Sequence, residues 1–147
     1  MEGAMFAASA LRMLGHPPLV VDLRATKKDS DHVIAVFQIN KCWGAISKTN
    51  HAVLRYREPI YRDWRELVMS FFHEYFLNNG RKTLREYSNP IDLSRFDKRD
   101  WTTSEKNLFF IPAALDRARH HKILTPAQLK TLRRADPIEI AAGKLTN

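Results

Sequence analysis

Two side chains in the first third of the sequence are of the types that together perform acyl transfer, a thiol and an imidazole. Cys42 is the only cysteine of the chain, and His32 opens an apolar run at residues 32–38. A thiol within hydrogen-bond reach of an imidazole becomes a strong nucleophile, because the imidazole takes up its proton. The first question is therefore whether the fold brings Cys42 and His32 together.

The predicted pairing of two strands keeps these side chains apart. Residues 32–38 and 42–48 have strand composition, and the short polar turn between them makes the strands antiparallel neighbours. In that register Cys42 faces Ile39, on the order of 20 Å along the strand from His32, since each residue advances the chain by about 3.3 Å. Cys42 also points to the opposite face of its strand. We therefore predict that Cys42 is a small buried hydrophobic side chain.

The same register places other polar side chains on the face that carries His32. Ser47 and Thr49 point to that face, whereas Asn50 points away from it unless a bulge intervenes. A single histidine at the start of an apolar strand is also found as a plain edge residue, and this alternative stays open.

Two other histidine sequences are weak candidates for metal binding. His73 and Glu74 lack the second histidine that the H-E-x-x-H zinc helix requires, so we place them on the polar edge of a helix. His120 and His121 lie in a basic stretch, which favours a solvated loop. The sequence therefore predicts no metal site and no cofactor.

Composition describes an ordinary globular chain with a basic surface. The chain has 147 residues, of which 44% are hydrophobic and 27% are charged, which suits one domain with a proper core. A single cysteine favours a reducing compartment, and the absence of a long apolar run or a signal peptide leads us to expect a cytoplasmic protein without a membrane partner. The net charge of +8 is spread along the chain and favours an acidic partner, although a solvated basic surface explains it as well.

The order of predicted elements indicates an α+β fold. An apolar stripe at helical spacing predicts a helix over residues 1–14, which Gly15 and the prolines that follow it would end. Strands are expected at residues 17–25, 32–38, 42–48 and 51–59. We expect this N-terminal helix to pack on an antiparallel sheet of about four strands, followed by helices.

The second half of the chain is predicted to be mostly helical. A single domain over residues 1–136 would consist of a helix-and-sheet core, 1–58, and a helical and loop region, 59–136, followed by a frayed tail, 137–147. Amphipathic spacing predicts a helix that ends at Gly80, and residues 82–87 prolong it or start a new turn. The other expected segments are a loop at 89–100 and helices at 102–115 and 124–137.

The order of these features resembles the core of the transglutaminase-like superfamily, the papain-related cysteine enzymes. In that core a nucleophilic cysteine starts a helix, a histidine begins the next strand but one, and a tryptophan opens the strand after it. His32 and Trp43 match the latter two positions, and residues 46–62 and 65–76 are similar to bacterial members of the group. The helix positions that match the family pattern are Ala4, Ala8, Leu11, Arg12, Leu14, Gly15 and Pro17.

The chain departs from this family pattern at two positions. The pattern puts the nucleophilic cysteine one residue before Met1, so we expect that the first turn of the helix and its thiol are missing from this chain. The resemblance implies that His32 is the catalytic histidine, but Ser47 stands where the family has an aspartate. Asn50 is the alternative third member, because papain relatives use asparagine there. Neither side chain carries the charge with which an aspartate stabilises an imidazolium.

The resemblance and the charge leave three functions to compare. The first is a transglutaminase-like domain related to thiol acyl-transferases and amide hydrolases, with a peptide or protein amide as its substrate, and inactive as it stands because the nucleophile is absent. The second is a non-catalytic binding module that uses the same groove. The third is a basic nucleic-acid-binding protein, which the charge alone supports, since no helix-turn-helix, zinc-finger or RNA-binding motif accompanies it.

Overall fold

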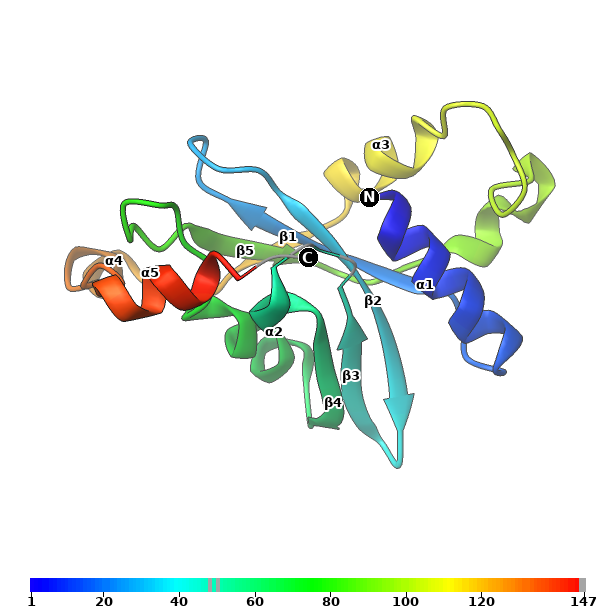
Figure 1. Cartoon of the computed structure of the whole chain (residues 1–147). Coiled ribbons are helices and arrows are strands. Elements are labelled where there is room, and N and C mark those ends of the chain that lie inside the picture. Colours follow the sequence, from blue (N-terminus) through cyan, green and yellow to red (C-terminus); the bar gives the residue numbers. More distant parts are fainter. Residues whose placement is uncertain (48, 50, 146–147) are drawn as a thin grey trace.

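The protein folds as an N-terminal helix, an antiparallel sheet and a series of short helices (Figure 1). The computed structural model describes residues 1–47, 49 and 51–145. The predicted α+β class is confirmed, but the sheet has seven strands where about four were expected. No helix in the described part of the chain is long and apolar enough to cross a lipid bilayer.

The helices and strands have the following bounds. The α-helices are α1 Glu2–Met13, α2 Trp64–Phe72, α3 Phe110–Arg117, α4 Pro126–Lys130 and α5 Pro137–Gly143. The strands are β1 Leu19–Ala25, β2 His32–Ile39, β3 Cys42–Ile46, β4 Tyr56–Tyr61, β5 Leu84–Ser88, β6 Ile91–Asp92 and β7 His120–Lys122. Two 3₁₀ helices complete the set, η1 Ala52–Leu54 and η2 Leu93–Arg99.

Strand β1 lies in the middle of the sheet. The strand order is β4-β3-β2-β1-β5-β7, and β6 pairs with the start of β1. The side chains of β1 enter two separate layers of the core in alternation, because successive residues of a strand point to opposite faces. Val20 belongs to one layer, while Val21 and Leu23 belong to the other.

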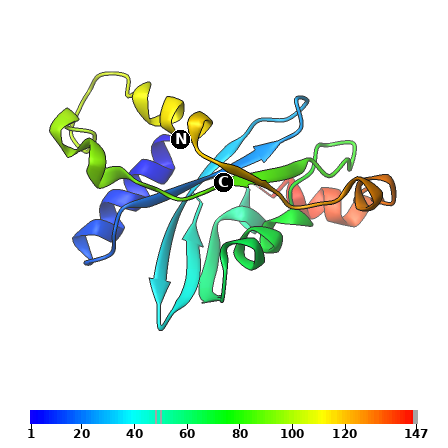
Figure 2. The same ribbon diagram turned by 180° about the vertical axis from the view of Figure 1, so that it is seen from behind.

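The two faces of the sheet are covered by different parts of the chain (Figures 1 and 2). On one face α1 packs with the segment that contains η2 and α3, and the buried side chains there include Ala8, Leu11, Val33, Phe37, Leu93, Trp101, Ile111 and Leu115. On the other face α2 supplies the cover, and the buried side chains include Ile34, Val36, Leu67, Val68, Phe71, Leu84 and Ile123.

The hairpin of β2 and β3 has the predicted register. Ile39 pairs with Cys42, and the turn residues Asn40 and Lys41 have φ angles of 50° and 66°. Two positive φ angles in a two-residue loop are typical of the tight turn that matches the twist of the flanking strands. Cys42 is half-buried, so it is more accessible than expected, and it lies at the turn end of the hairpin, away from His32.

The prediction of helix or turn for residues 82–87 is wrong, because this segment forms most of β5. Glu86 and Tyr87 pair with Arg24 and Leu23 of β1. A buried central strand needs a hydrogen-bonding neighbour on both edges, and only a distant segment can satisfy the edge that β2 leaves open. The predicted helix before it also ends early, at Phe72, because the chain then folds back through a turn in which Gly80 donates to the carbonyl of Leu77.

The helix predicted over 124–137 ends at Lys130, and prolines explain two further differences between the predicted and observed helices. Pro112 lies in the first turn of α3, so the helix begins at Phe110 and not near 102, because proline inside a longer helix would remove a backbone hydrogen bond. Pro137, which the prediction places at the end of a helix, begins α5, and Asp136 and Glu139 form a capping box there. Much of the segment predicted to be a frayed tail is therefore a capped helix.

Two glycines with positive φ provide a test of this packing. A Cβ on Gly80 would lie 2.6 Å from the backbone oxygen of Ala135, whereas a Cβ on Gly15 would have no heavy atom within 4 Å. We expect Gly15→Ala to cost about 1 kcal/mol, because only the left-handed conformation opposes it. Gly80→Ala should cost roughly 3 kcal/mol, since a backbone atom cannot move aside cheaply. Urea unfolding of both variants measures the difference, and equal costs would contradict the close approach of residues 80 and 135.

Candidate functional site

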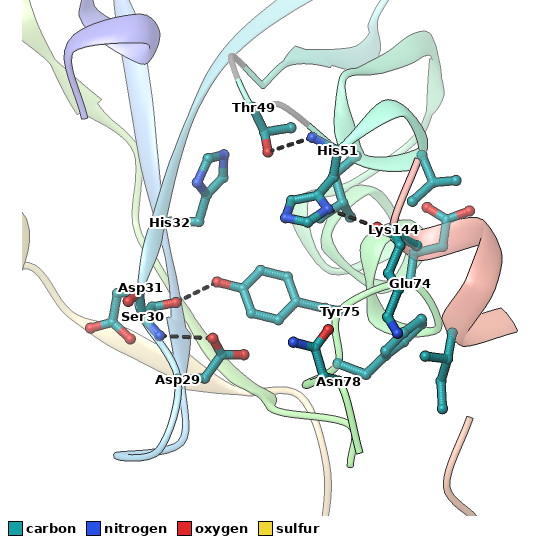
Figure 3. A pocket seen from close by; sticks show the side chains of 15 residues that line it. Asp29, Ser30, Asp31, His32, Thr49, His51, Glu74, Tyr75, Asn78 and Lys144 are labelled. Atoms are coloured by element: carbon teal, nitrogen blue, oxygen red, sulfur yellow. Dashed lines mark hydrogen bonds between the residues drawn. The ribbon is translucent and has the colours of Figure 1, made fainter. Parts of the chain in front are cut away.

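A pocket of about 230 Å³ opens beside the first residue of β2 (Figure 3). Its walls come from the turn between β1 and β2, from the segment around η1, from the residues after α2 and from α5. The imidazole rings of His32 and His51 lie on opposite sides of the pocket. The ring of Tyr75 lies below them and points toward the turn between β1 and β2. The pocket therefore combines two imidazoles with a phenol and several carboxylates.

His32 is held by a hydrogen bond to Ser47. The Nε2 atom of His32 lies 2.6 Å from the Oγ atom of Ser47. The pairing of β2 with β3 ends at Ala35 and Ile46, and the backbone N–H of Ser47 donates instead to the carbonyl of Arg55. The chain thus turns away from β2 and leaves room for the imidazole to reach the serine. The two residues predicted to share a face are therefore in direct contact.

The burial of Ser47 determines what this hydrogen bond can do. Ser47 is 2% exposed, so a substrate has no access to its oxygen. The geometry allows this oxygen to orient the imidazole of His32. Thr49 also lines the pocket, where its hydroxyl oxygen accepts from the backbone N–H of His51. Asn50, the alternative partner predicted for His32, lies outside the described residues.

The other nitrogen of His32 is available for proton transfer. Across residues 1–47, 49 and 51–145, the Nδ1 atom has no hydrogen-bond partner. Burial lowers the pKa of His32, and the positive charges of the Met1 α-amino group and of His51 lower it further. The ring is therefore neutral at neutral pH and can accept a proton. Helix α1 packs on the strand that this histidine begins, since Ala4 and Val33 belong to the same core layer.

The phenol and the carboxylates of the pocket wall are already engaged in hydrogen bonds or ion pairs. The hydroxyl of Tyr75 donates to the carbonyl of Ser30 at 2.8 Å, and burial raises its pKa well above the usual value. Asp29 accepts hydrogen bonds from the hydroxyl of Thr83 and from the backbone N–H of Ser30. These contacts tie the turn between β1 and β2 to Tyr75 and Thr83, in the segment between α2 and β5.

Helix α5 contributes a wall that the sequence did not predict. The Nδ1 atom of His51 lies 2.7 Å from the carbonyl oxygen of Gly143, at the end of α5, and donates to it. The backbone N–H of Ala52 donates to the carbonyl of Leu145. Asp136 and Glu139 carry a local capping signal for this helix, but the prediction of one helix over 124–137 places Pro137 at the end of a helix. Tyr75 belongs to both the core and the pocket wall.

The histidine pair after α3 does not form the predicted solvated loop. His120 and His121 belong to β7, and the Nε2 atom of His120 lies 3.1 Å from the carboxylate of Asp22. This contact is buried, and it lies outside the pocket beside His32. No group of three or more His, Cys, Asp or Glu side chains within the described ranges could hold a metal ion.

The lowered pKa of His32 predicts a pH-dependent stability. Because the folded protein holds this proton less tightly than the unfolded chain, whose histidine pKa is 6.5, the free energy of unfolding should increase as the pH rises toward that value. His51→Gln should raise the pKa of His32, since it removes one neighbouring positive charge. NMR titration of the His32 ring protons measures this shift. The exposed His73→Gln variant is the control, and an equal effect of both substitutions would refute the assignment.

The comparisons with known proteins add no relative to this description. A scan of the chain against models of protein families found no match. A search of curated proteins also found no similar protein. The resemblance to the transglutaminase-like superfamily therefore rests on the residues of this chain.

Proposed function

We propose that this chain is a transglutaminase-like domain, related to thiol acyl-transferases and amide hydrolases, whose polar centre is the His32–Ser47 pair. The observation that carries the proposal is the orientation of His32. Its Nε2 atom is held by a buried serine, while Nδ1 has no partner in the described part of the chain. The ring lies on a pocket wall and begins the strand on which α1 packs, and the family pattern requires a thiol at the start of that helix.

The physical chemistry of a thiol at that position supports the proposal. A helix N-terminus stabilises a thiolate, since the free N–H groups and the helix dipole place positive charge there. The sulfur would attack the carbonyl carbon of a peptide or protein amide, and His32 would pass the thiol proton to the leaving amine. Water or a second amine would then cleave the thioester. Ser47 orients the imidazole, but it stabilises the imidazolium less than an aspartate would.

We expect no such reaction from this chain as it stands. Its only cysteine, Cys42, pairs with Ile39 at the far end of the hairpin from His32. When the chain is treated with an acylating probe for thiols, we therefore expect no labelling that depends on His32. The unpaired thiol also fits a reducing compartment, so we assign the protein to the cytoplasm as part of this proposal.

The proposal is tested by supplying the thiol. In a chain extended by a short leader whose last residue, directly before Met1, is cysteine, p-nitrophenyl acetate should acylate the new sulfur and release p-nitrophenolate in a burst. Substituting His32 by alanine in the extended chain should slow the burst by about 100-fold, the usual contribution of a general base. A burst rate that does not depend on His32 would refute the proposed role of this histidine.

The matched control places a thiol elsewhere on the same helix. Phe6 is exposed on α1, so Phe6→Cys introduces an accessible thiol without disturbing the core. This thiol should react at the rate of an ordinary cysteine, with or without His32. Ser47→Ala in the extended chain should shift the pH profile of the burst, because the imidazole loses its orienting hydrogen bond. An unchanged profile would contradict the positioning role of Ser47.

A second candidate is a non-catalytic binding module that uses the same pocket. The absence of a thiol near His32 favours it, as does a pocket wall whose carboxylates and phenol are already hydrogen-bonded. In that case the extended chain would show no burst, and His32→Ala would leave ligand binding unchanged.

A further inference from the structure

A second pocket, of about 480 Å³, is lined mainly by cationic side chains. It is lined by residues from the turn after β1, from the start of β5 and the residues just before it, and from the end of α4 and the segment after it. Its charged lining residues are Lys27, Lys28, Arg81, Lys82, Arg85, Arg133 and Arg134, and no carboxylate lines it. These residues come from three distant parts of the sequence, so the fold has concentrated positive charge that the sequence shows only as scattered.

Lys82 is the most informative member of this cluster. It is 4% exposed, although lysine is almost never fully buried unless it is paired. Its ammonium donates to the carbonyl of His73 at 3.2 Å and lies 5.8 Å from the centre of the Phe76 ring. In the described part of the chain it forms no ion pair with a carboxylate. The charge of Lys82 acts on the carboxylate of Glu139, which is itself paired with Arg133, so Lys82 adds to the positive charge of the cluster.

The carboxylates near the cluster, Asp136 and Glu139, are already engaged, and Asp136 accepts hydrogen bonds from the backbone N–H groups of Ile138 and Glu139. Glu139 accepts two hydrogen bonds from Arg133 and one from the backbone N–H of Asp136, and these bonds lower its pKa to about 2. Arg81 and Arg134 form no ion pair within the described residues. The pKa of Arg85 is lowered by burial and then by repulsion from Arg81. The pocket therefore holds an excess of positive charge at short range.

We propose that this pocket binds an organic anion that carries two or more phosphate groups. Phosphate suits the site because arginine forks bind its oxygens in pairs and lysines add point charge. More than one phosphate is required to balance several cations that have no carboxylate partner. Leu129 and Leu132 form an apolar part of the wall, which suits a ring or chain attached to the phosphates and not a bare inorganic ion. This site is separate from the pocket beside His32.

The test is a titration with ADP, pyrophosphate and adenosine in phosphate-free buffer at about 0.15 M salt. Calorimetry should show binding of ADP, weaker binding of pyrophosphate and no binding of adenosine. In the double variant Arg81→Gln, Arg134→Gln the affinity for ADP should fall by about tenfold or more. Both side chains are exposed, so the variant should fold normally.

A matched variant separates the pocket from net charge. Arg117→Gln, Arg119→Gln removes two exposed cations from outside this pocket and should leave the affinity for ADP within about twofold of the wild type. An equal loss in both double variants, or no binding of ADP and pyrophosphate to the wild type, would overturn the proposal. Tight binding of a single-stranded oligonucleotide that ADP does not displace would overturn it too, since the surface would then serve nucleic acid.

Lys82→Met provides an independent readout. Because it removes a buried charge, it should raise the melting temperature of the free protein, and it should also abolish the increase in melting temperature that ADP produces in the wild type. A structural role for Lys82 alone predicts the opposite pair of results, namely a lower melting temperature and an unchanged response to ADP.

Discussion

The fold depends on the burial of β1 on both faces. This strand has hydrogen-bonded neighbours on both edges, and its alternate side chains enter two core layers that never meet. One layer requires α1 and the η2–α3 segment, and the other requires α2. Because β1 needs β5 as its second neighbour, residues far along the chain have to return to the sheet. The positions of both pockets follow from the return of the chain to the sheet at β5.

The pocket beside His32 exists because two strands end at different points. Strand β2 begins at His32, but its pairing with β3 stops at Ala35 and Ile46. The departing chain places Ser47 against the imidazole, and η1 and α5 close the other side. A histidine at the open edge of a sheet is thereby both partly buried and accessible. Burial keeps the ring neutral, and access leaves Nδ1 for chemistry.

The turn between β1 and β2 connects the two pockets. Its first residues, including Lys27, line the cationic pocket, and its last residues, including Asp29, line the pocket beside His32. Thr83 joins both ends, since its carbonyl accepts from the backbone N–H of Thr26 and its hydroxyl donates to Asp29. The same short turn therefore lines both pockets, so a ligand in either pocket would contact this turn.

The sequence by itself determined the features that depend on local spacing. The α+β class, the register of the β2–β3 hairpin and the shared face of His32 and Ser47 follow from strand alternation and a short turn, which are local properties. Only the tertiary structure decided that residues 82–87 form a strand and that Lys82 is buried beside other cations. The local sequence is compatible with more than one structure, and distant partners make the choice, because the second edge of β1 needs a hydrogen-bonding neighbour.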